Sequence, residues 1–167
     1  LTALVAFSGL LMAGSVSAVN ANANVPAPAK SVELARYLGR WYELARYENR
    51  FEKGCEAVTA TYTQRDGHIE VVNACHKGDV DGPYKAYKGK AKVVDGSNGA
   101  KLKVSFFPPF YGNYWILDRD EKYSWSIVGE PKGKYLWILT RDSTPSPQTV
   151  ETLRQRAAAL GYDLDKL

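Results

Sequence analysis

Few side chains in this sequence have the types and spacing that chemistry requires. The chain has two cysteines, Cys55 and Cys75, and two histidines, His68 and His76. It contains no Gly-x-Ser-x-Gly elbow, His-Glu-x-x-His pair, glycine-rich phosphate loop or Cys-x-x-Cys pair. His68 adjoins a turn, where a solvated position is expected, and no second ligand is spaced to hold a metal or haem with His76. The sequence therefore predicts a non-enzymatic protein with no metal site and no cofactor.

Charge divides the chain into an uncharged start and a mixed remainder. The 22 basic and 18 acidic side chains all follow Ala29. Residues 1–23 are predicted to be a secretory signal peptide, cleaved after Ala18 or Ala23. A single membrane anchor is the alternative, although two glycines and four Ser/Thr side chains within the first 19 residues make a poor span. Residues 24–30 are predicted to be a linker. The net charge of +4 with interspersed signs predicts no basic stripe and no nucleic-acid partner.

An export signal changes the interpretation of the two cysteines. In an exported chain an even pair favours one disulfide, and two buried free thiols are the alternative. Cys55 begins a predicted strand and Cys75 nearly ends the next. Counting back from the turn at 66–67, position 55 faces about position 78 in a regular register, so a bulge is needed to close the gap. Such a bridge would hold the rim of the fold beside the loop at 48–54.

The rest of the chain predicts the elements that must position these side chains. Asp-Gly turns at 66–67, 81–82 and 95–96 separate short runs of alternating apolar residues. Eight consecutive strands with short links favour an all-β, antiparallel up-and-down barrel, because closure removes exposed sheet edges. The expected strands are Arg40–Tyr47, Cys55–Arg65, His68–His76, Tyr84–Val94, Lys101–Phe107, Asn113–Asp118, Tyr123–Gly129 and Lys134–Arg141.

Helical signals flank the strands at both ends. A short helical turn is expected over Ser31–Leu38. Near the C-terminus, Ser146 is a candidate N-cap, Pro147 occupies the first helical position and Gly161 supplies the stop. The helix between them has one apolar face, which we expect to pack on the outside of the barrel. This face carries Val150, Leu153, Ala157 and Leu160.

Strand parity indicates what lies inside the barrel. In the run 101–107 the lysines must face water, so the residues between them point inward: Leu102, Val104 and Phe106. Gly89 and Ala91 share one face of their strand and are expected to leave room for a cavity. An eight-stranded barrel is just wide enough to be filled or to hold one small ligand. The last two strands are apolar on both faces, so parity alone does not assign their sides.

Three blocks of sequence carry a family resemblance. They are Gly39-Arg40-Trp41-Tyr42, the run 113–118 and the run 136–141. In this order and spacing they resemble the signature regions of the lipocalins. The runs 50–55 and 103–107 look like the bacterial branch, which includes outer-membrane lipoproteins and is similar to apolipoprotein D. The resemblance covers residues 31–167, the predicted lipocalin domain.

The resemblance implies a ligand pocket, with a solid core as the alternative. It places these residues toward the cavity: Val58, Ala60, Tyr62, Val71, Asn73, Tyr114, Ile116, Ser126, Val128, Trp137 and Leu139. With Gly89, Leu102, Val104 and Phe106 from parity, they form the predicted pocket. The outward side of the last two strands, under the C-terminal helix, would carry Trp125, Ile127, Leu136 and Ile138.

A structural pair is expected at the closed end. Trp41 begins the first strand and Arg141 ends the last, so barrel closure brings them together. A guanidinium over an indole contributes about 0.5–2 kcal/mol. The resemblance likewise implies that Gly39, Trp41 and Arg141 plug this end without touching ligand. Glu43 has the parity of Trp41 and is expected to bond polar groups near the closed end, with an inward-pointing buried acid as the alternative.

These observations favour binding and transport of a small hydrophobic ligand. By resemblance, the ligand is a fatty acid or lysophospholipid in the cell envelope. A lipocalin-fold enzyme of the isomerase type and a pigment or tetrapyrrole carrier are the alternatives. Basic side chains near the open end either attract an anionic head group or form a solvated rim: Arg46, Arg50, Lys53, Lys77 and Lys85.

The expected location is the periplasm or the outer membrane. The stretch Met12-Ala13-Gly14-Ser15 resembles a lipoprotein cleavage box with Ser15 in place of cysteine. Lipidation needs the thiol, so the sequence argues against a lipid anchor and favours a soluble periplasmic protein. Peripheral contact with the outer membrane remains open, and a monomer or weak dimer is expected.

Overall fold

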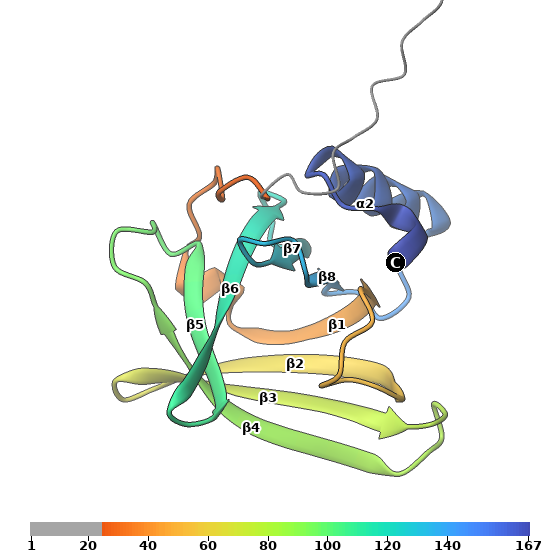
Figure 1. Cartoon of the computed structure of the whole chain (residues 1–167), viewed down its shortest axis with the longest axis horizontal. Helices are drawn as coiled ribbons and strands as arrows, with labels where there is room; N and C mark the ends of the chain where they lie inside the picture. Colours follow the sequence, from red (N-terminus) through yellow and green to blue (C-terminus); the bar gives the residue numbers. More distant parts are fainter. Residues whose placement is uncertain (1–24) are drawn as a thin grey trace, which may run out of the picture.

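The computed structural model describes residues 25–167, and the predicted signal peptide lies outside this range. Eight strands and two α-helices follow one another within it (Figure 1). The helices are α1 (Leu34–Tyr37) and α2 (Pro147–Ala159), and a 3-10 turn, η1 (Leu164–Lys166), ends the chain. The strands are β1 (Gly39–Arg46), β2 (Cys55–Arg65), β3 (His68–Lys77), β4 (Tyr84–Val93), β5 (Lys101–Phe107), β6 (Phe110–Arg119), β7 (Trp125–Gly129) and β8 (Leu136–Thr140).

The strands form a closed barrel in sequence order, which confirms the predicted fold. Each strand pairs antiparallel with the next, and β8 returns to β1 with Tyr42 opposite Thr140. Closure leaves no unpaired edge. The predicted bounds differ most in β6, which begins at Phe110 rather than Asn113. The reason is that Phe107 and Phe110 pair across a tight Pro-Pro turn, so the hairpin is longer than its apolar pattern suggested.

Helix α2 lies outside the barrel beside β7 and β8 (Figure 1), as predicted. Its cap is confirmed, because Ser146 Oγ accepts the Thr149 N–H and Gly161 follows the helix with a φ of +93°. Leu153 and Ala157 are completely buried in an outer cluster formed with strand residues. The strand members of this cluster include Leu117, Ile127, Leu136 and Ile138.

The segment predicted as a linker lies against the barrel in the part that is described. Val25 is buried in the outer cluster, and its side chain lies near Gly133. Lys30 Nζ pairs with Asp118 Oδ1 at 2.8 Å. These contacts cover part of the wall next to α2.

An inner cluster occupies the barrel itself and meets the outer one across the thickness of the sheet. In β7, Val128 belongs to the inner cluster and Ile127 to the outer one. In β8, Leu139 and Trp137 pack with the inner cluster, whereas Ile138 packs with the outer one. The two strands that parity left unassigned therefore take the sides that the family resemblance implied.

Candidate functional site

The closed end of the barrel is sealed by Trp41 and Arg141. Trp41 has no exposed surface, and the guanidinium carbon of Arg141 lies 3.7 Å from the centre of its ring. Arg141 also donates to the carbonyls of Arg40 at 2.6 Å and Leu38 at 2.7 Å. Gly39 has a φ of +94°, and a Cβ there would lie 3.3 Å from Arg141 Nη1. This geometry is that of the predicted structural plug.

A tyrosine cluster lies above the plug. It consists of Tyr37 from α1, Tyr62 from β2, Tyr114 from β6 and Ser126 from β7. The Tyr114 hydroxyl lies 2.8 Å from those of Tyr37 and Tyr62, and Tyr37 lies 3.2 Å from Ser126 Oγ. Burial raises the pKa of Tyr37 to about 12, and it raises the pKa values of Tyr62 and Tyr114 well above 10.0. The phenols therefore stay neutral and form a hydrogen-bonded floor.

Above this floor the inward side chains are of two kinds. The first kind is almost fully buried and belongs to the inner cluster: Tyr62, Val71, Leu102, Ile116, Val128 and Leu139. The second kind packs on the same cluster but remains partly exposed: Ala60, Val104, Phe106, Tyr114 and Trp137. The predicted pocket residues are thus mostly brought together on one inner surface, and part of that surface is open to solvent.

Two predicted pocket residues take a different place. Gly89 does not leave an empty space, because a Cβ there would lie 2.8 Å from Cδ1 of Phe106. The Phe106 ring fills the room that the missing side chain was expected to leave. Val58 packs with the two cysteines in a small cluster of their own rather than in the inner cluster.

The disulfide between Cys55 and Cys75 is formed, with 5.4 Å between the Cα atoms. The predicted bulge is present as well. The β2–β3 register shifts between Glu56 and Thr59, and Ala57 within this segment has a φ of +49°. The extra residue moves Cys55 into range of Cys75 and turns Val58 toward the bridge.

Asn73 carries an unused polar atom inside the barrel. Its Oδ1 is buried and has no hydrogen-bond partner among the described residues. Asn73 pairs with Ala60 on β2 and with Tyr87 on β4, and the Tyr87 side chain is 46% exposed. A buried acceptor without a partner costs about 1–3 kcal/mol, so a ligand donor there would be stabilising.

Polar side chains gather at the open end in what we call the mouth cluster: Glu43, Arg46, Asn49, Glu52 and Trp137. Arg46 Nη1 donates to Glu43 Oε1 at 2.7 Å. Glu52 Oε2 accepts from Asn49 Nδ2 at 2.6 Å and from Trp137 Nε1 at 2.8 Å. Burial, together with the neighbouring Glu52, raises the pKa of Glu43 to about 8. Glu43 therefore holds a proton at neutral pH.

The mouth cluster differs from the sequence-based expectation for Glu43 and includes two residues that were not among the expected site residues. Glu43 was expected to bond polar groups near the closed end. Instead, its carboxyl group is turned toward the open end, because it accepts a hydrogen bond from Arg46, three positions further along β1. Asn49 and Glu52 were not predicted from the sequence. Their signal was the Asn-x-x-Glu spacing, in which Asn49 Oδ1 accepts the N–H groups of Phe51 and Glu52.

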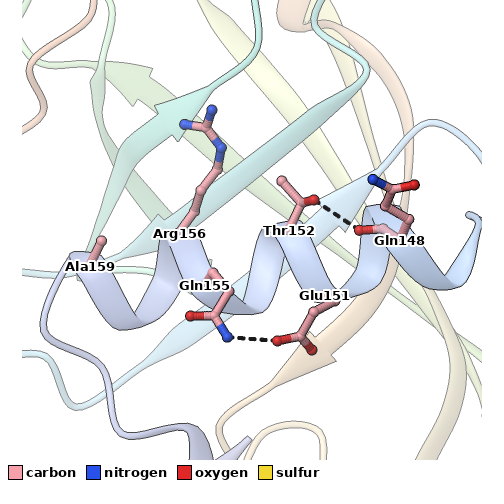
Figure 2. A pocket seen from close by; sticks show the side chains of 6 residues that line it. All are labelled: Gln148, Glu151, Thr152, Gln155, Arg156 and Ala159. Carbon is pink, nitrogen blue, oxygen red and sulfur yellow. Dashed lines mark hydrogen bonds between the residues drawn. The ribbon is translucent and has the colours of Figure 1, made fainter.

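Other features of the described chain give less support for a ligand site. Figure 2 shows a hollow on the outer surface of α2 that is lined by side chains of this helix alone. Gln155 donates to Glu151 within it, and a hollow with one wall does not enclose a ligand.

His76 Nδ1 lies 2.8 Å from the Gly82 carbonyl. Residues 25–167 contain no group of three His, Cys, Asp or Glu side chains suited to a metal, and none of their helices combines the length and apolarity of a membrane span.

Known proteins resemble this chain in sequence or in fold. A family model described as a lipocalin-like domain matches residues 32–167. The outer membrane lipoprotein Blc of Vibrio cholerae is 41% identical over 142 residues, covering 84% of this chain and 82% of that protein. Apolipoprotein D of Mus musculus is 33% identical over 154 residues, covering 85% and 78%. Insecticyanin of Manduca sexta shares the fold with a TM-score of 0.66 over 87% of this chain and 86% of its own, at 17% identity. The chain therefore belongs to the lipocalin family, as its three sequence blocks predicted.

Proposed function

We propose that this chain is a non-enzymatic carrier that holds the acyl chain of a fatty acid or lysophospholipid in its barrel. One observation carries the proposal: the inward side chains of Ala60, Val104, Phe106, Tyr114 and Trp137 are only partly buried. A filled core would exclude water from such side chains, whereas a cavity leaves them accessible. Each CH₂ group removed from water contributes about 0.8 kcal/mol, so an acyl chain along this surface binds through burial.

The polar end of the ligand is expected near Asn73 and the mouth cluster. The Asn73 amide has an acceptor without a protein partner, so it suits a hydroxyl or a protonated head group. The oxygen atoms of Glu43 and Glu52 already accept bonds from Arg46 and Trp137. The mouth cluster therefore shapes the opening but discriminates little between head groups. The apolar cavity likewise discriminates weakly between acyl chains of different length.

The isomerase alternative has no support in the thiol chemistry. Such an enzyme would use a cavity nucleophile, and both cysteines are joined in the disulfide. The pigment alternative makes a visible prediction, since a carrier purified with its ligand would be coloured. We expect a colourless protein with an acyl lipid bound.

The first experiment is native mass spectrometry of the mature protein purified without detergent, followed by organic extraction. Near-stoichiometric fatty acid or lysophospholipid is the expected result. A protein that stays free of ligand after addition of oleate and of lysophosphatidylethanolamine would overturn the proposal.

A matched pair of variants tests the position of the ligand. Trp137→Glu places a charge on the inner surface, whereas Trp125→Glu makes the same change at a half-buried position of the outer cluster. Titration with a fluorescent fatty acid should show at least tenfold weaker binding for Trp137→Glu and parental affinity for Trp125→Glu. Equal affinities in both variants would contradict the assignment of the ligand to the inside of the barrel.

We further propose that the protein is exported to the cell envelope and works as a monomer or weak dimer. The apolar start of the chain supports export, and the similarity to an outer membrane lipoprotein supports the envelope. Because Ser15 stands where the acceptor cysteine would be, the chain is expected to lack a lipid anchor. Metabolic labelling with palmitate and cell fractionation test this: a labelled protein would contradict it.

A further inference from the structure

Exposed aromatic side chains gather at the tip of the β5–β6 hairpin. Phe107 is 72% exposed, Phe110 is 77% exposed and Tyr111 is 47% exposed. Pro108 and Pro109 join them and are exposed too. We call these five residues the hairpin tip. No charged side chain occurs between Lys103 and Asp118, so the tip presents an apolar surface of several side chains at the open end of the barrel.

A strip of lysines lies on the outer face of the adjoining strands. Lys88, Lys90 and Lys92 alternate along β4 with the buried residues Gly89 and Ala91, so they point outward. Lys103 on β5 pairs with Lys92. We call these four exposed lysines the lysine strip.

The lysine strip is not neutralised by ion pairs with acidic side chains. None of its four lysines forms an ion pair with another described residue. The carboxylate of Glu70 lies on the neighbouring strand opposite Lys90, but Arg65 already pairs with it at 2.9 Å. Strand pairing brings together on one face lysines that are up to 15 positions apart, a grouping that the interspersed charges of the sequence did not indicate.

The strip and the tip form one continuous feature. Lys103 and Phe107 belong to the same strand, and four residues of strand span about 13 Å. Figure 1 shows β5 and β6 running together to their turn, with β4 next to β5. A surface that offers both aromatic side chains and unpaired lysines is complementary to an anionic bilayer, whose head groups attract the lysines and whose interface accepts the aromatic rings.

We propose that the hairpin tip and the lysine strip dock this chain on an anionic lipid surface. Docking brings the open end of the barrel close to the bilayer, where an acyl lipid can move between membrane and cavity. The proposal goes beyond lipid binding and does not depend on which ligand the barrel holds. The docked surface is this hairpin with β4, and α2 on the other side of the barrel takes no part.

The test is co-sedimentation with vesicles of phosphatidylcholine, with and without 30% phosphatidylglycerol. The parent should bind the anionic vesicles at least tenfold more tightly than the neutral ones, and salt should weaken the binding. Phe107→Ser/Phe110→Ser should lose at least tenfold in affinity. Lys90→Gln/Lys103→Gln should lose a similar factor, because each lysine at an anionic surface contributes about fivefold.

Controls at other sites separate docking from general charge or stability effects. Lys122→Gln/Lys166→Gln removes two exposed lysines outside the strip, and Val93→Ser changes an exposed apolar side chain far from the tip. These variants should bind vesicles like the parent. All variants should show the parental melting temperature and parental affinity for a fluorescent fatty acid, so a failure of docking is distinguishable from a failure of ligand binding.

Several outcomes would overturn the proposal. Equal binding to neutral and anionic vesicles, or parental binding by both double variants, would show that this surface does not dock the protein on anionic lipid. Tighter binding of a single-stranded oligonucleotide than of anionic vesicles, lost in the lysine variant, would assign the strip to nucleic acid. A concentration-dependent dimer that Phe107→Ser/Phe110→Ser abolishes, without vesicle binding, would assign the tip to a second copy of the chain.

Discussion

Replacement of Glu43 by Gln should change how the stability of this protein depends on pH. The Glu43 side chain is 6% exposed, and its pKa is raised from 4.5 to about 8 by burial and by Glu52. Between these two values the unfolded chain has released the proton and the folded protein still holds it. The free energy of unfolding of the parent therefore falls as pH rises, by up to about 1.4 kcal/mol per unit for one proton.

The glutamine variant removes this proton without changing the shape of the side chain. Its amide is neutral like the protonated carboxyl, and its oxygen can still accept from Arg46. At pH 5.5, about one unit above the unfolded pKa, the variant should already be more stable than the parent by about 1.4 kcal/mol. Between pH 5.5 and 7.5 this difference should grow by about 2–3 kcal/mol more, because only the parent's unfolded state gains from ionisation.

The assay is urea unfolding of both proteins at half-unit steps from pH 5.5 to 7.5. Glu70→Gln is the control, since Arg65 lowers the pKa of Glu70 and its titration ends below this range. The difference between that control and the parent should stay constant. If the Glu43→Gln curve also runs parallel to that of the parent, Glu43 is ionised in the folded protein and the description of the mouth cluster is wrong.

Three further outcomes follow from the geometry. Arg141→Ala removes the contact with Trp41 and the bonds to the α1 and β1 carbonyls, so urea unfolding should show a loss of about 2–4 kcal/mol while fatty-acid affinity at low temperature stays parental. Gly89→Ala places a Cβ 2.7 Å from the Ser105 carbonyl oxygen and 2.8 Å from the Phe106 ring, so it should cost about 1–3 kcal/mol. Gly112→Ala, with 3.9 Å to its nearest neighbour, should be nearly neutral, and equal effects of the two changes would contradict the close approach. In the unfolded, unreduced protein neither cysteine should react with a thiol reagent, and mass analysis that finds two labels would disprove the disulfide.

The strand order and the capping of α2 could be predicted because they depend on local chemistry. Asp-Gly turns divide the strands, and alternation within each strand assigns inward and outward sides where lysines mark the solvent, as in β5. Ser146 and Gly161 mark the ends of α2 through bonds to their own neighbours. The contact between Trp41 and Arg141 also followed from sequence, since closing the sheet must bring the first and last strands together.

Contacts between distant segments could not be predicted in this way. Nothing local indicates that Glu52 reaches Trp137, 85 positions away, or that Tyr37 of α1 completes the tyrosine cluster. Alternation alone left the sides of β7 and β8 undecided because both faces are apolar. The family resemblance implied these sides, and the position of α2 over Ile127 and Ile138 gives the physical reason for them. Alternation and turns act over a few residues, so the sequence by itself determined the barrel and its closed end. How the loops and rings fill the open end depends on packing across the closed barrel, and only the tertiary structure decided it.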